Sequence, residues 1–488
     1  MPTPARPTPL AAALHRTPWH AALLLALSLG AASAGAAPLS IEEAQLRLAD
    51  KSGTLRAARL HREARELEAQ ATRSLSLPQV NATVMYSKLE RDYEVDVSPV
   101  TGKLNQAVGV IGGATGIKLP QLPSTVEYQY KNEGVRPIVG FNWPLFTGGK
   151  ISATQDLATA RTAEASAEER HAGEALTTQL VKTYYGLLLA EHAVAVRTAV
   201  AAALTRHLHQ AERFEKTGMI ARADRLHAQV AYDEAQRNLF KAQDERALAQ
   251  IALNRMLVSA QDVSPSSPLF VRSKPLEPIE TWAQHGLAAH PGLALLDAKR
   301  QQTAQLETIA RSALMPEVFA FGTYQFNKEV LTPVEPDWVV GVGLRFTLFD
   351  RIDRGSMIAA SQRQSAGLAA YTEQARDDIS TLIDKRWREV EQARQRYLLL
   401  ESSIALADEN VKLRESGFRE GLSTSLDLVD ARLALSRAQI DRAQAARDYV
   451  VALAELLEAS GQSERFAEYA QHADLRIERP TPVTVTQP

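Results

Sequence analysis

The sequence predicts a mainly α-helical, internally duplicated protein that also carries strands suited to a membrane β-barrel. Two observations predict it. A turn-like stretch, Phe418–Ala431, repeats an earlier one, Phe214–Ala228, and the glycines of the two stretches stand 203 residues apart. Proline is absent from two long windows, 145–264 and 337–479, which are rich in good helix formers. A repeated helical turn between long helices indicates a duplicated chain.

The N-terminus predicts a secretory signal peptide over residues 1–36. Arg6 and Arg16 supply positive charge, residues 21–29 are a short apolar run, and residues 32–36 offer small-residue cleavage sites. The alternative is an N-terminal membrane anchor, but the run is short for a spanning helix. We expect no other stretch to approach the ~20 apolar residues of a membrane helix.

Two helical segments open the two copies. Residues 39–75 predict a helix interrupted near Gly53, and residues 278–313 predict its counterpart, interrupted at Pro291-Gly292, at an offset of 238 residues. Pro78 and Pro316 follow, and proline cannot continue a helix.

Strand patterns come next in each copy. Apolar residues alternate with small or polar ones, as a membrane β-barrel requires, although a soluble hairpin would give the same alternation. The apolar positions are Val80, Ala82, Val84, Tyr86, Val139, Phe141, Trp143, Leu145, Val340, Val342, Leu344, Phe346 and Leu348. The first hairpin holds 35 extra residues, and the glycine- and proline-rich stretch 98–124 predicts a long exposed loop.

Each hairpin leads into a long helix and a shorter returning helix. Residues 149–217 have room for about 100 Å of helix at ~1.5 Å per residue. A helix of this length must lie against other long helices in a coiled coil. The full division is 1–36 signal peptide, 37–77 equatorial helices, 78–147 first hairpin, 148–260 first coiled coil, 261–315 connector and equatorial helices, 316–349 second hairpin, 350–461 second coiled coil, and 462–488 a polar tail left without assigned structure.

The composition excludes several functional classes. A net charge of −2 does not indicate a nucleic-acid binder, and the absence of cysteine excludes disulfides and thiolate metal sites. His207 and His209 stand two residues apart, so on a helix they point to different faces and make a poor metal pair. No phosphate loop, serine elbow or thiol nucleophile is present. We therefore expect neither an enzyme nor a cofactor.

The chain resembles the TolC family of outer-membrane efflux and export channels. The resemblance rests on the duplicated order of helix, hairpin, long helix, tip and return helix. It also rests on the strand-end phrase Pro144–Gly149 and the tip motif Gly421-x5-Asp427-Leu-Val-Asp430-Ala431. It implies a homotrimer whose twelve strands close a barrel in outer-membrane lipid and continue into a helical tunnel across the periplasm. It also implies a periplasmic adaptor and an inner-membrane pump as partners.

The resemblance also implies roles for residues at the tips. Asp427 and Asp430 match paired aspartates that form constricting acidic rings, whereas Thr424-x-x-Asp427 also reads as a helix capping box. Gly218 and Gly421 match the tip turns that meet the adaptor.

Asp224 matches a tip aspartate that latches the closed state through a basic partner. Ser423 stands where that partner is common, so the latch would need Arg222, Arg225 or Arg419. The simpler alternative is that Asp224 complements a helix dipole.

The function predicted is that of an exit duct in a tripartite efflux or type I secretion system. The alternative from another class is a soluble periplasmic coiled-coil scaffold or adaptor, in which the hairpins form a small β domain. Two copies with central hairpins disfavour this alternative, because adaptors usually carry one helical hairpin. Extraction without detergent would favour it.

Overall fold

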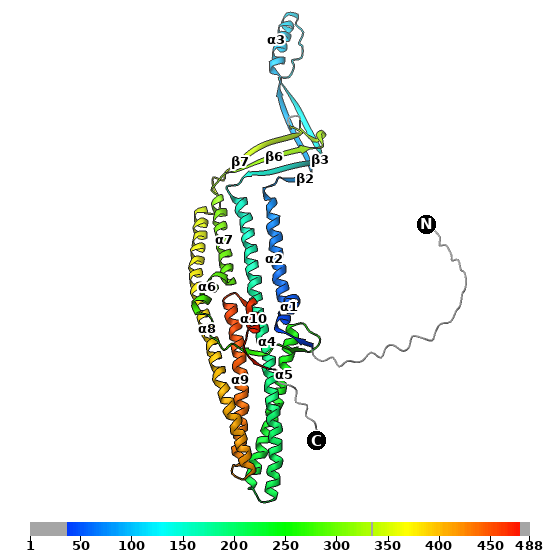
Figure 1. Cartoon of the computed structure of the whole chain (residues 1–488). Helices are drawn as coiled ribbons and strands as arrows, with labels where there is room; N and C mark the ends of the chain where they lie inside the picture. Colours follow the sequence, from blue (N-terminus) through cyan, green and yellow to red (C-terminus); the bar gives the residue numbers. More distant parts are fainter. Residues whose placement is uncertain (1–36, 333–334, 479–488) are drawn as a thin grey trace, which may run out of the picture.

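The computed structural model describes residues 37–332 and 335–478 as an elongated molecule (Figure 1). Long helices run in parallel along most of its length, a four-stranded sheet lies across one end of them, and one helix projects beyond the sheet. The predicted signal peptide, residues 1–36, lies outside the described residues.

The first copy consists of two short helices, a hairpin and two long helices. Its elements are α1 (Ile41–Lys51), α2 (Gly53–Thr72), the 3-10 turn η1 (Arg73–Ser76), β2 (Gln79–Asp96), α3 (Ser98–Thr115), β3 (Thr125–Phe146), α4 (Lys150–Lys216) and α5 (Arg222–Met256). The predicted break near Gly53 is confirmed: Ser52 ends α1 and caps α2, its hydroxyl accepting a bond from the backbone N–H of Leu55.

The second copy repeats this order. Its elements are α6 (Ile279–Ala289), α7 (Pro291–Ser312), β6 (Glu317–Gln325), the 3-10 turn η2 (Lys328–Val330), β7 (Trp338–Arg345), α8 (Arg354–Arg419) and α9 (Ser425–Ala459). The two long helices, α4 and α8, contain 67 and 66 residues. This near-identity of length supports an internal duplication.

The two hairpins form one antiparallel sheet in the order β2-β3-β6-β7. Its register places an apolar row on one face of all four strands: Val80, Phe141, Gly322 and Val340. Exposed apolar side chains cover this face, including Val84, Trp143, Val342 and Leu344. On the other face, a Cβ at Gly343 would stand 2.6 Å from the Phe319 ring, which explains the small residue there.

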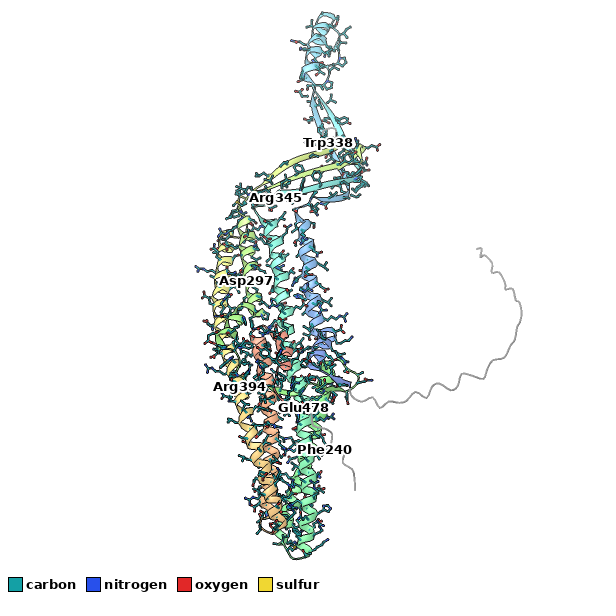
Figure 2. All side chains as sticks on the ribbon, in the orientation of Figure 1. Phe240, Asp297, Trp338, Arg345, Arg394 and Glu478 are labelled. Atoms are coloured by element: carbon teal, nitrogen blue, oxygen red, sulfur yellow. The ribbon has the colours of Figure 1, made fainter. Side chains whose placement is uncertain are left out.

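The ends of the strands depart from the sequence prediction. The expected alternation continued to Leu348, but β7 ends at Arg345, close to the helices (Figure 2). In β3 the pairing shifts between Pro144 and Phe146, so Leu145 lies in a bulge. Proline cannot donate a hydrogen bond to the ladder, and such residues favour irregular pairing.

The expected loop 98–124 is wrong in its first part. Residues 98–115 form the helix α3, with Pro99 in its first turn and Gly116 in the left-handed conformation after its end (φ +64°). Proline is well tolerated at a helix start and glycine at its end. The remaining residues return to β3 without regular structure, and α3 has no buried residue.

The core lies around the middle of the long helices. Tyr185 contacts Phe270 and Phe466 with ring centroids 6.0 and 6.2 Å apart, and Phe270 contacts Tyr449 at 6.2 Å. Such edge-to-face aromatic pairs stabilise a core beyond the burial of their area. Two short sheets border it, β1 (Ala37–Leu39) with β4 (Val263–Pro265) and β5 (Leu269–Val271) with β8 (Leu475–Ile477).

The region beyond residue 462 is not the polar tail that we expected. Residues 463–477 form η3 (Ser463–Arg465), α10 (Phe466–Gln471) and β8, and Phe466 is buried in the core. This stretch is mostly polar and packs through a few apolar residues, which its composition does not reveal. Residues 479–488 lie outside the described part of the chain.

Among the described helices, α4 contains one segment that is long and apolar enough to cross a membrane by length and composition. On that criterion, our expectation of no such stretch is wrong. A third of the segment (33%) is buried within the chain, and a core helix passes the same test. Leu180, Tyr184 and Leu188 of α4 belong to the central core, which explains its apolar composition.

Candidate functional site

The two helical tips lie together at the end of the molecule opposite the sheet (Figure 1). One tip joins α4 to α5 and the other joins α8 to α9, and α9 packs against both α4 and α5. The predicted residues Gly218, Asp224, Gly421, Asp427 and Asp430 are therefore gathered in one region.

Both tips end their long helices with the same backbone device. Gly218 and Gly421 adopt left-handed φ angles of +77° and +76°. The N–H of Met219 donates to the Phe214 carbonyl at 2.9 Å, and the N–H of Leu422 donates to the Gly417 carbonyl at 2.7 Å. These bonds satisfy carbonyl groups at the helix ends, and glycine adopts this conformation without strain.

Asp427 closes a capping box at the start of α9. Its carboxylate accepts bonds from the Thr424 backbone N–H (3.0 Å) and hydroxyl (2.8 Å), while its own N–H donates to the Thr424 hydroxyl at 3.2 Å. Hydrogen bonding from Thr424 lowers the pKa of Asp427 below its ordinary value, aided weakly by Arg414 at 4.0 Å. The carboxylate is 41% exposed and therefore still faces solvent. Within one chain Asp427 therefore acts as the helix cap expected from Thr424-x-x-Asp427. The lowered pKa keeps its carboxylate charged.

Asp430 lies one turn further along α9 and is exposed. Within residues 37–332 and 335–478, it forms neither a hydrogen bond nor an ion pair. Residues three apart share a helix face, so its carboxylate and that of Asp427 lie on the same side of α9.

Asp224 stands in the first turn of α5, where a negative charge complements the helix dipole. Two of the three expected latch partners bind elsewhere. Arg225 pairs with Glu215 at 2.7 Å, and Arg419 donates to the Ser416 hydroxyl at 3.1 Å. In the described part of a single chain, no ion pair to Asp224 forms.

A buried cluster joins the two tips, and the sequence analysis did not identify it. His207 of α4 is 3% exposed, and its Nε2 lies 2.8 Å from the Ser425 hydroxyl at the start of α9. The Phe418 ring of α8 packs against the His207 ring at 4.7 Å and against Phe214 at 5.8 Å. We name these four residues the tip clamp. The signal for this cluster in the sequence is the spacing of seven residues between His207 and Phe214, which places both on the same face of α4.

The tip clamp keeps its histidine uncharged. Burial, with a smaller contribution from the nearby Arg432 charge, lowers the pKa of His207 to about 4. Its Nδ1 is buried without a hydrogen-bond partner, so the N–H that a charged ring carries there would have no acceptor. His209, in contrast, is exposed, and its Nδ1 lies 2.9 Å from the Thr205 carbonyl. The two histidines therefore point to different surroundings.

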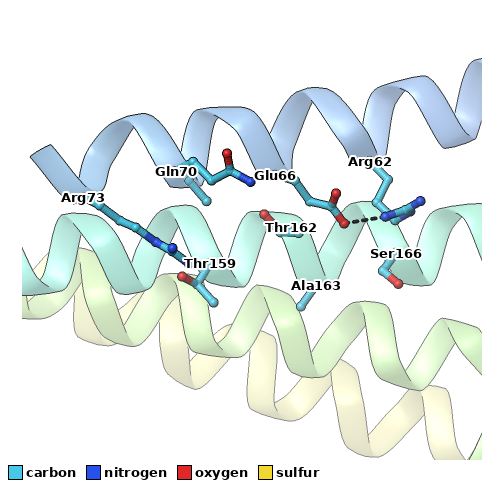
Figure 3. A pocket seen from close by; sticks show the side chains of 9 residues that line it. Arg62, Glu66, Gln70, Arg73, Thr159, Thr162, Ala163 and Ser166 are labelled. Carbon is cyan, nitrogen blue, oxygen red and sulfur yellow. Dashed lines mark hydrogen bonds and ion pairs between the residues drawn. The ribbon is translucent and has the colours of Figure 1, made fainter.

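A polar groove of about 560 Å³ lies between α2 and α4, far from the tips (Figure 3). Arg62 contacts Glu66 one turn further along the same helix, α2, and its Nε donates to Glu169 of α4 at 2.7 Å. The lining is Arg62, Glu66, Ala69, Gln70, Arg73, Thr159, Thr162, Ala163 and Ser166. This lining contains no histidine, cysteine or aspartate, and the groove is better explained as polar helix packing than as a reaction site.

A family model described as "Outer membrane efflux protein" matches residues 47–258 and 282–462. The chain belongs to this family. The resemblance drawn from the tips and hairpins is thereby confirmed, as is a location in the outer membrane.

Individual relatives are distant but extend along much of the chain. CyaE of Bordetella pertussis is 25% identical over 264 residues, which cover 52% of this chain. The chain thus spans about half (55%) of the length of CyaE. The outer membrane efflux protein BepC of Brucella suis is 25% identical over 368 residues, 72% of this chain and 76% of BepC.

Solved channels share the fold. The CmeC outer membrane channel of Campylobacter jejuni matches with a TM-score of 0.68 and 13% identity, covering 89% of this chain and 90% of CmeC. The fold is therefore that of the TolC-like channels, in which hairpins continue into long helices. The family consists of channel proteins rather than enzymes, consistent with the absence of catalytic motifs from the sequence.

Proposed function

We propose that three copies of this chain form the outer-membrane exit duct of a tripartite efflux or type I secretion system. The observation that carries this proposal is the four-stranded sheet, which has an exposed apolar face and free edges at β2 and β7. Open strand edges are not tolerated in lipid, so the sheet must close with other strands. Three copies would supply ~12 strands, within the range of bacterial barrels.

The long helices support a tunnel built from several copies. Exposed leucines recur every seven residues along α8, at Leu399, Leu406 and Leu413, and Phe240 is exposed on α5 (Figure 2). A heptad row of leucines on a long helix is typical of packing against another helix. The neighbouring copies would cover these rows and enclose a tunnel.

The gate in this proposal is the second tip. Three copies would place six carboxylates, Asp427 and Asp430 from each, around a narrow opening that favours cations. Repulsion among them would raise some pKa values, whereas the Thr424 hydrogen bonds act in the opposite direction on Asp427. Gly218, Gly421 and Asp224 would lie where a periplasmic adaptor, bound to an inner-membrane pump, meets and opens the tips.

Single-channel recording tests the gate. Detergent-extracted protein in a planar bilayer should give small, cation-selective currents. The double variant Asp427→Ala with Asp430→Ala should increase the leak and weaken the cation selectivity. A matched control, Asp408→Ala with Glu409→Ala, removes the same charge from α8, where Lys412 pairs with both carboxylates. Equal currents and selectivity in the wild type and the tip variant would contradict the gate assignment.

The mass of the detergent-extracted particle tests the assembly. A particle of three chains is expected. Recovery as a monomer from the periplasm without detergent would contradict the duct and favour the scaffold alternative.

A further inference from the structure

The α3 helix stands apart from the rest of the molecule, at the end of the β2–β3 ribbon (Figure 1). The second hairpin shows no counterpart in its described residues, which form only the short turn η2 between β6 and β7. The segment around η2 reaches along β3 as far as Tyr130, whose hydroxyl donates to the Leu331 carbonyl at 2.8 Å. The ribbon continues beyond this contact for five residue pairs, from Asp92↔Gln129 to Asp96↔Thr125. At ~3.3 Å per residue, α3 begins about 17 Å beyond this contact.

The α3 helix and the segment that follows it form a defined unit. The side chain of Asn105 bonds the return segment twice, donating to the Leu122 carbonyl at 2.8 Å and accepting from the Leu122 N–H at 2.7 Å. At the base, the Val97 N–H donates to the Ser124 carbonyl at 2.9 Å. The helix therefore presents one face to its own return segment and leaves the other face free. We call residues 98–124 the α3 hairpin.

The free face of α3 is apolar. Val100, Leu104, Ala107 and Ile111 follow the spacing of one helix face and are all exposed. No charged residue occurs between Leu104 and Ile117. Four glycines lie within the 18-residue helix, and each costs about 1 kcal/mol relative to alanine in a helix interior. A helix weakened in this way needs packing partners to be stable.

The membrane is a poor partner for this face. The strands β6 and β7, nine and eight residues long, are close to the ~9–11 residues of one membrane crossing. Beyond them the ribbon carries ion pairs, Lys88 with Glu133 at 3.1 Å and Lys131 with Glu90 at 2.8 Å. Charged residues belong outside the lipid, so this ribbon holds α3 in water, away from the bilayer. An apolar face in water requires a protein surface to cover it.

We propose that the α3 hairpins of three copies pack against one another through the Val100–Ile111 face and cap the outer mouth of the channel. This inference rests on the proposed trimer, in which the hairpin ends of neighbouring copies surround the barrel mouth. The three faces are chemically identical and contain no acidic residue, so the contact among them would be apolar. Lys103, at the border of each face, is the charged residue nearest to this contact. The cap would restrict the exit until the passing substrate displaced it.

Cysteine cross-linking tests the cap, because the natural chain has no cysteine. Ile111→Cys places a thiol on the proposed interface, where the side chain is 53% exposed in one chain. Gln106→Cys is the matched control, an exposed residue of the same helix on a different face. Disulfides need Cβ atoms within ~4 Å, so we expect oxidation to give about tenfold more covalent dimer with Ile111→Cys than with Gln106→Cys. Light scattering of the same detergent-extracted samples reports the assembly.

The outcomes separate the cap from the trimer. Trimers with preferential cross-linking through Ile111→Cys support the cap. Trimers in which the two variants cross-link equally, or not at all, overturn the cap and leave the duct standing, whereas a monomer overturns both. As a second readout, oxidation of the Ile111→Cys trimer should lower its conductance in a bilayer, and a reductant should restore it. Unchanged conductance with the cross-link formed would show that the hairpins do not cover the exit.

Discussion

The tip clamp should make the closure of the two tips dependent on pH. His207 has a pKa of about 4 in the clamp, against 6.5 for the ordinary side chain. A tip that opens and hydrates this ring regains the ordinary value, so the open state takes up a proton at higher pH than the closed state. The contribution of the clamp is therefore fully present above pH 6.5 and is lost as the pH falls toward 4.

The size of the effect follows from the two pKa values. Between pH 7 and pH 5, proton uptake by the open state lowers the free energy of opening by about 2 kcal/mol, or roughly 20-fold in the opening equilibrium. Arg432 is the nearby charge that disfavours the protonated ring, and it is itself paired with Glu415 at 3.1 Å. A protonated His207 ring carries an N–H on both nitrogens, and the one at Nδ1 has no acceptor in the closed clamp.

Hydrogen exchange of the detergent-extracted protein measures this opening. Peptides covering 205–216 and 418–430 should lose protection at pH 5 relative to pH 7, after correction for the intrinsic exchange rate. His207→Gln is the control, because glutamine can bond Ser425 and does not titrate in this range. Equal protection at the two pH values in the wild type, or an equal loss in His207→Gln, would refute the reasoning.

Two further substitutions test how the tip and the core are held. Thr424→Ala removes the capping partner of Asp427 and should destabilise the start of α9 by about 1 kcal/mol, measured as faster hydrogen exchange there. Thr205→Ala is the control, because the Thr205 hydroxyl bonds only the preceding turn of α4 and its loss should not change that exchange. Phe466→Ala empties a buried position in the core and should lower the free energy of unfolding by about 3–5 kcal/mol, measured as a lower thermal midpoint. The control is Phe326→Ala, at an exposed position. Equal shifts of the midpoint in the two variants would contradict the packing assigned to residues 463–477.

Local backbone chemistry was predictable because it depends on neighbours in the chain. Gly218 and Gly421 end their helices as expected, and the breaks at Ser52 and His290 fall beside the predicted glycine and proline. The periodicity of the strands likewise predicted which residues share the exposed face of the sheet. Asp427 was predicted as both a cap and a gate, and a single chain shows only the cap.

The functional region needed the tertiary structure where partners lie far apart in sequence. Ser425 is 218 residues from His207, and no local pattern indicates that a histidine on α4 meets it. The sequence alone allowed Arg225 as a partner of Asp224, and the structure shows that Arg225 pairs with Glu215 instead.

The sequence by itself determined the duplication, the long helices, the hairpins and the positions of both tips, because each depends on periodicity or on a residue with special backbone preferences. Only the tertiary structure decided that residues 463–477 complete the core, that α3 is a helix with a free apolar face, and that a buried histidine joins the tips. These features depend on what long-range packing buries, and burial sets both the pKa of His207 and the exposure of Ile111.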